Sequence, residues 1–257
     1  MSEDLVIPHY CIDLIQKVRE VSGKPLVCRV EYSRFDSELR VARNADKFHE
    51  LLCSPDYRHF IVHFLVSALK KIIRVLEAPK NMRYVPAVNS GGDLPIAEKA
   101  EFERRTPALS KGERDLFSRL MFDGIARQLT SMPIDLRVER EIKQTLPEHR
   151  PLQREYLERQ VADLIPHFDS AVRAFTPERV YNASSYMHAA LMLEAAEIAR
   201  VGVPEVLKDT EIEARGRDLL SILRSIEEPG LPGDRKAANA WAQQLGLEAW
   251  YDWTPLE

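Results

Sequence analysis

The chain has 257 residues, of which 45% are hydrophobic and 30% are charged, and its formal net charge is −4. This balance is typical of a globular protein that buries a substantial core, and it differs from the low-hydrophobicity, high-charge composition of disordered chains. The weak negative charge provides no strong basic field, which argues against nucleic acid as the main partner.

Targeting and cysteine patterns indicate a reducing compartment. The first residues, Met1-Ser2-Glu3-Asp4, lack the basic and then apolar pattern of a secretory signal. No uninterrupted apolar stretch approaches the roughly 20 residues that span a bilayer. Cys11, Cys28 and Cys53 form no CxxC pair, which argues against a disulfide framework or a cysteine zinc site. We therefore expect a cytoplasmic protein without a membrane partner, in which the cysteines are small buried thiols.

The N-terminal part of the chain predicts a helix followed by a small sheet. Apolar residues recur at helical spacing over residues 7–22, and Gly23 with Pro25 ends that run. Three strand-like runs follow, separated by turn-forming residues, at 26–32, 38–43 and 47–53. The simplest arrangement is a three-stranded antiparallel meander, which is too small to stand alone and must pack on helices.

The rest of the chain is predicted to be helical apart from one connection. Residues 57–77 are apolar over most of a helical circumference, which predicts a centrally buried helix. Residues 78–111 contain four prolines and are expected to form a long irregular connection. Pro133 is expected to end a helix over 113–129 and to start another.

These elements predict an α+β fold that is predominantly helical, with the small antiparallel sheet near the N-terminus packed on helices. We expect a core over residues 1–146 and a helical extension over residues 147–257, or alternatively one continuous domain.

The most informative motif is His59-Phe60-Ile61-Val62-His63. Two histidines four residues apart share one face of a helix, which is how a helix offers two imidazoles to one zinc ion. A peptidase helix of the HExxH kind also needs a glutamate directly after the first histidine as general base. Phe60 occupies that position and cannot accept a proton, which argues against an enzyme. The alternative is that both histidines merely continue a solvated polar stripe.

The order of the predicted elements resembles the minimal core of the zincin group of zinc metallopeptidases, and most of all its ImmA/IrrE-like branch. The resemblance covers about residues 7–146. In those families a carboxylate on a later helix supplies the third metal ligand, which implies Asp135 or Glu139 beside His59 and His63. The alternative for the two carboxylates is a first-turn charge favoured by the helix dipole and a solvated neighbour.

Aromatic residues crowd the C-terminus, at Trp241, Trp250, Tyr251 and Trp253. One interpretation is a segment docked on the body by aromatic burial. The other is an exposed anchor for a partner, because tryptophan and tyrosine dominate interface hot spots. The connection over residues 86–107 is a further candidate interaction surface.

Three functions follow as hypotheses. The first is a non-catalytic, zincin-like pseudoprotease that has no cofactor and binds another protein, encoded nearby, in a bacterial regulatory or anti-phage defence system. The second is a zinc-dependent hydrolase or peptidase with His59, His63 and Glu139 (or Asp135) as ligands and a base such as Glu50 or Asp56. The third is a structural helical subunit of a larger complex.

Overall fold

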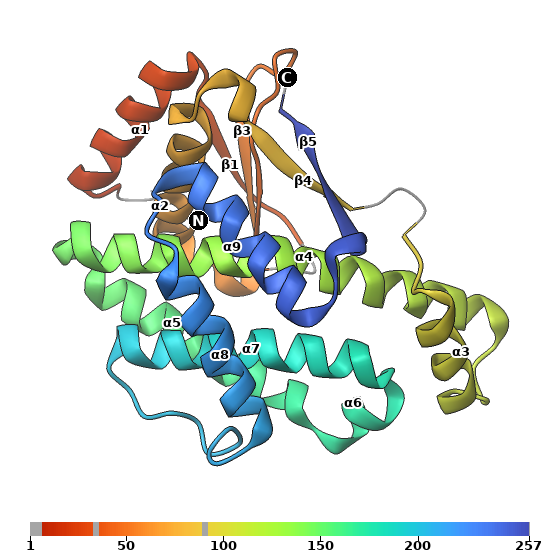
Figure 1. The fold of residues 1–257 in the computed structure, drawn as a ribbon. Coiled ribbons are helices and arrows are strands. Elements are labelled where there is room, and N and C mark those ends of the chain that lie inside the picture. The colour runs from red at the N-terminus through yellow and green to blue at the C-terminus, as the bar shows by residue number, and fades with distance from the viewer. Residues whose placement is uncertain (1–6, 33–35, 89–91, 257) are drawn as a thin grey trace.

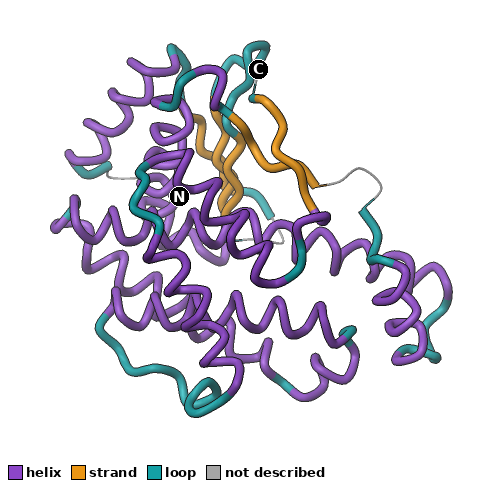
Figure 2. The backbone as a smooth tube through the Cα atoms, viewed as in Figure 1, coloured by secondary structure: helices purple, strands orange, loops and turns teal. Residues whose placement is uncertain are grey.

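The computed structural model describes residues 7–32, 36–88 and 92–256. The long helix α4 (Lys111–Thr145) crosses the molecule, and the strands gather on one side of it (Figures 1 and 2). The helices on the other side of α4 are α5 (Arg150–Leu164), α6 (Ser170–Phe175), α7 (Glu178–Ala199) and α8 (Glu211–Ser225). The predominantly helical fold with a small sheet near the N-terminus is therefore confirmed.

The N-terminal sheet is mixed rather than antiparallel. It follows α1 (His9–Ser22) and consists of β1 (Leu26–Val30), β2 (Ser37–Arg40) and β3 (His49–Cys53). The strand order is β1-β3-β2, with β1 parallel and β2 antiparallel to β3. The three predicted strands are confirmed, but the predicted meander is wrong. The central strand is β3, and its alternate residues His49, Leu51 and Cys53 are all buried.

The helix predicted over residues 57–77 starts later than expected. Pro55–Phe60 forms a 3-10 turn, and the α-helix α2 runs from Ile61 to Glu77. Tyr57 has non-helical dihedrals, with φ −110° and ψ 15°. The central burial of α2 is as predicted, because most of its residues are buried. His59 and His63 consequently lie in different kinds of helix.

The connection over residues 78–111 is more regular than predicted. It contains β4 (Tyr84–Val88) and α3 (Ile96–Arg105), although residues 89–91 lie outside the described part. The strand β4 pairs antiparallel with β5 (Tyr251–Pro255) at the other end of the chain. A local sequence pattern could not show this pairing, because the partner lies more than 160 residues away.

The predicted break at Pro133 is also wrong, since α4 continues through it. A proline inside a helix removes one backbone hydrogen bond and crowds the carbonyl four residues earlier. Burial of Leu129, Pro133 and Leu136 against neighbouring helices outweighs that local cost. The helix begins with a capping box in which Ser110 and Glu113 each bond the other's backbone N–H.

Contacts cross the boundary predicted between residues 146 and 147. The helix α7 packs on α4, and α9 (Gly230–Leu245) packs on α4 and α2. Whether the chain is divided into two domains stays a prediction. Within the described residues, no helix combines the length and apolar character that crossing a bilayer requires.

Candidate functional site

The structure brings together two of the four predicted metal ligands. His63 on α2 is 1% exposed, and its Nε2 lies 3.1 Å from Oε1 of the buried Glu139 on α4. The amide of Gln153, on α5, donates to Oε2 and to the backbone carbonyl of Glu139, both at 2.7 Å. The carboxylate therefore has two protein partners in a site closed to water.

A third group, which the sequence analysis missed, completes this arrangement. His149 ends the 3-10 turn Pro147–His149, and its Nε2 lies 3.0 Å from Nδ1 of His63. The hydroxyl of Tyr10 on α1 lies 2.9 Å from Nδ1 of His149. Tyr10, His149, His63, Glu139 and Gln153 thus form one continuous chain of hydrogen bonds, called the buried polar chain below.

The distances fit a single direction of hydrogen bonding along the buried polar chain. Tyr10 donates to His149, His149 donates to His63, and His63 donates to Glu139. Burial, followed by the proximity of His63, lowers the pKa of His149 to about 4. Burial alone raises the pKa of Glu139, but the charge and hydrogen bond of His63 together with Gln153 overcome it and hold that pKa below its ordinary value. Its two neighbours therefore favour the ionised form of the Glu139 carboxylate in spite of its burial.

The other two predicted ligands point elsewhere. The side chain of His59 is 66% exposed, and its Nε2 lies 3.0 Å from Glu155. Asp135 pairs with Lys71 at 2.6 Å. Sharing one face requires a continuous α-helix through both histidines, but His59 lies in a 3-10 turn, in which the angular step per residue differs.

The buried polar chain runs end to end and does not converge on one point. The two ring nitrogens of His63 face opposite neighbours, His149 and Glu139. Across the described residues, no group of three or more His, Cys, Asp or Glu is arranged to hold a metal ion. The metal-binding role of His59, His63, Asp135 and Glu139 stays a prediction.

Aromatic side chains surround Phe60, the residue that follows His59 in the histidine motif. Phe60 is buried and packs edge-on against Tyr156, with ring centroids 5.5 Å apart. Tyr156 also lies 4.3 Å from the ring of His63. Of the alternative bases, Glu50 pairs with Arg29 and Arg40, and Asp56 is exposed.

The C-terminal aromatic segment is docked on the body. Trp241, Trp250 and Tyr251 are buried. The indole of Trp241 donates to the carbonyl of Leu219 at 2.9 Å, and Trp250 stacks on Phe122 with centroids 5.0 Å apart. Docking by aromatic burial is confirmed, whereas a partner-binding role for these residues and for the partly exposed Trp253 stays a prediction.

The first half of α4 exposes apolar residues. Leu116 is 50% exposed and Leu120 is 39% exposed. Gly112 and Gly124 continue the same four-residue spacing, and a Cβ added at either glycine would meet no atom within 4 Å. We call these four residues the α4 stripe. The stripe belongs to the first half of α4, and the start of α4 forms with α3 an arm that projects from the body (Figure 1).

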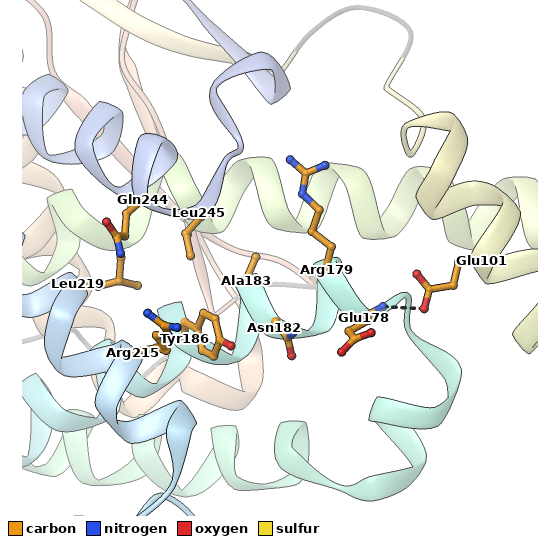
Figure 3. A pocket seen from close by; sticks show the side chains of 10 residues that line it. All are labelled: Glu101, Glu178, Arg179, Asn182, Ala183, Tyr186, Arg215, Leu219, Gln244 and Leu245. Carbon is orange, nitrogen blue, oxygen red and sulfur yellow. Dashed lines mark hydrogen bonds between the residues drawn. The ribbon is translucent and has the colours of Figure 1, made fainter.

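A pocket of about 540 Å³ lies between α3, α7, α8 and α9 (Figure 3). Arg215 lies beside Tyr186 at one end, while Glu101 and Glu178 lie at the other. The carboxylate of Glu101 accepts from the backbone N–H of Glu178 at 3.1 Å and pairs with Arg105 at 2.6 Å. The acidic end of the pocket is thus partly neutralised by the protein itself.

Comparison with protein-family models, with curated proteins and with solved structures gives no match for this chain. The resemblance to the zincin group therefore stays a prediction from the order of elements and the histidine motif.

Proposed function

We propose that this protein is a non-catalytic, zincin-like pseudoprotease that acts by binding another protein on the α4 stripe. The observation that carries the proposal is the exposure of Leu116 and Leu120 side by side on a projecting helix. Ile96, at the start of α3 in the same arm, is 89% exposed. Adjacent apolar side chains in water are a feature of surfaces that a partner covers.

The shape of the α4 stripe fits a helical partner. Residues spaced by four form a ridge along a helix, and ridges of this kind pack into the grooves of a second helix. The missing side chains at Gly112 and Gly124 would let a partner backbone approach α4 closely, with Leu116 and Leu120 as the apolar contact between them.

The buried polar chain supports a role without catalysis. His63 uses both ring nitrogens within the protein, and Phe60 occupies the position of the peptidase base in an aromatic cluster. A setting that fits such a protein is a bacterial regulatory or anti-phage defence system in which it is an accessory and its partner is encoded nearby.

Affinity capture from native lysate, and co-expression with each neighbouring open reading frame, test the proposal. We expect wild-type protein to retain a stoichiometric partner and Leu116→Glu/Leu120→Glu to retain at least tenfold less. Ile12→Glu on α1 is the matched control, because Ile12 is an equally exposed apolar residue outside the arm. Equal retention by the double variant, or repeated absence of any stoichiometric partner, would contradict the proposal. Concentration-dependent mass in light scattering would instead favour the structural-subunit alternative.

A second candidate, the zinc-dependent hydrolase, is favoured by one observation. His63 and Glu139 come within 3.1 Å of each other although 76 residues separate them, and both have the chemistry of zinc ligands. Metal analysis distinguishes this candidate from the first.

A further inference from the structure

Two free cysteines meet in the N-terminal sheet. Sγ of Cys28 on β1 lies 3.9 Å from Sγ of Cys53 on β3, and neither is in a disulfide. In the parallel register, Cys28 is opposite Leu51 and Val30 is opposite Cys53. The two thiols are therefore diagonal neighbours on the same face of the sheet.

The two thiols differ in their access to solvent. Cys53 is fully buried on the central strand, whereas Cys28 is partly exposed on a strand that pairs with β3 alone among the described strands. Val30, on the same face of β1, is exposed. Cys28 is therefore the more exposed of the two residues, and the buried Cys53 lies in contact with it.

The contact between the two thiols shifts their pKa values in opposite directions. The hydrogen bond between the two thiols lowers the pKa of Cys28, and the same bond with burial raises the pKa of Cys53. Cys11, buried on α1, provides a contrast, because burial raises its pKa to about 11. Reactive cysteines combine thiolate character with exposure, and redox-sensing ones often lie next to a second thiol that resolves the first product.

We propose that Cys28 and Cys53 form a modification site for hydroperoxides, with Cys28 as the attacking thiol and Cys53 as the resolving thiol. With hydrogen peroxide, the Cys28 thiolate attacks one peroxide oxygen, the O–O bond breaks and hydroxide leaves. With an organic hydroperoxide the thiolate attacks the terminal oxygen, and an alkoxide leaves. This step oxidises the sulfur to a sulfenic acid and reduces the peroxide. The Cys53 sulfur then attacks the Cys28 sulfur, the S–O bond breaks, and the Cys53 proton and the leaving hydroxide depart as water. The product is a disulfide between β1 and β3.

Closing the bond requires β1 to shift. Diagonal neighbours in a sheet are about 7–8 Å apart, whereas disulfides span Cα separations of about 4.4–6.8 Å. The edge strand can move because β3 holds it on one side only within the described residues. A disulfide that displaces a strand is easily reduced, so the modification is reversible by a dithiol. This inference is independent of the binding function proposed for the α4 stripe.

Intact-mass analysis of the full chain tests the site. Protein reduced with dithiothreitol and freed of it is treated with one equivalent of hydrogen peroxide. It is then unfolded in guanidinium chloride and alkylated with N-ethylmaleimide, so that the buried thiols can also react. We expect untreated protein to take up three maleimides and oxidised protein to take up one, with a peptide that links Cys28 to Cys53. Dithiothreitol should restore the uptake of three.

Variants assign the roles of the two thiols. Cys53→Ser should stop at a sulfenic acid on Cys28 that dimedone traps, and Cys28→Ser should lower the rate of oxidation at least tenfold. Cys11→Ser is the matched control and should still form the disulfide at the wild-type rate. Full alkylation after peroxide, a linked peptide that contains Cys11, or a disulfide between two chains would each overturn the proposal. The peptide map of wild-type protein decides these outcomes even if a serine variant fails to fold.

Discussion

The imidazole of His63 donates to the carboxylate of Glu139 across 3.1 Å in the protein interior, while His59, four residues before His63, lies at the surface. The spacing that suggests a metal-binding pair is therefore divided between two environments. The turn Pro55–Phe60 separates them, because the α-helix begins only at Ile61.

Metal analysis should show that His59 and His63 do not bind zinc together. We expect protein purified without an affinity tag to contain less than about a tenth of an equivalent of zinc, because the buried polar chain occupies both ring nitrogens of His63. The variant His59→Ala/His63→Ala should give the same value. Near-stoichiometric zinc in the wild type that is lost in the variant would revive the hydrolase hypothesis.

The free energy of unfolding should decrease as the pH is lowered from about 6.5 to about 4, because His149 is buried in the folded protein. Its folded pKa of about 4 lies below its ordinary value of 6.5, so between these values the unfolded state binds more protons and the free energy of unfolding decreases as the pH falls. At about 1.4 kcal/mol for each pKa unit, the loss from this residue is at most about 3.5 kcal/mol. Urea denaturation at pH 7 and pH 4.5 measures it.

The variant His149→Gln isolates this effect. It should be less stable than wild type at pH 7, because His63 and Tyr10 lose a partner, but it should lose less stability on going to pH 4.5. His59→Gln should follow the wild-type profile, since His59 is exposed. An unchanged profile for His149→Gln would show that other groups account for the pH dependence.

Sequence patterns predicted the elements better than their long-range partners. The periodicity of α2 is a local signal, and it predicted a centrally buried helix correctly. The strand-like runs predicted the three strands of the N-terminal sheet but not their order. The pairing of β4 with β5 and the position of His149 depend on contacts across 169 and 86 residues, such as Thr254 with Val85 and His149 with His63. No local pattern marks His149, which follows Pro147 in an otherwise polar turn.

A buried carboxylate on α9 should be important for stability. Asp234 accepts from Nε of Arg74 at 2.8 Å and from Nε of Arg137 at 2.9 Å, and it joins α2, α4 and α9. Asp234→Ala leaves two largely buried guanidinium groups without this partner, and we expect a loss of about 3–5 kcal/mol in the free energy of unfolding. The exposed pair Arg154–Glu158 is the control, and Glu158→Ala should cost less than about 1 kcal/mol. Similar losses of stability in Asp234→Ala and Glu158→Ala would contradict the prediction that the buried carboxylate contributes more.

Replacing Gly124 of the α4 stripe should change the stability of the protein and its binding of a partner in opposite directions. Glycine inside a helix is less stable than alanine by about 0.5–1 kcal/mol, and a Cβ at Gly124 meets no atom of the protein within 4 Å. Gly124→Ala should therefore raise the thermal midpoint by about 1–4 °C in a calorimetric scan. If a partner backbone lies against α4 there, the same methyl group should weaken partner capture. The contrasting variant is Gly233→Ala, whose Cβ would lie 1.7 Å from the carbonyl oxygen of Glu228 and should unfold the protein. If Gly124→Ala is more stable than wild type and still captures the partner fully, Gly124 does not lie in the interface. If the variant is more stable but captures less partner, the added methyl group lies against the partner, as proposed.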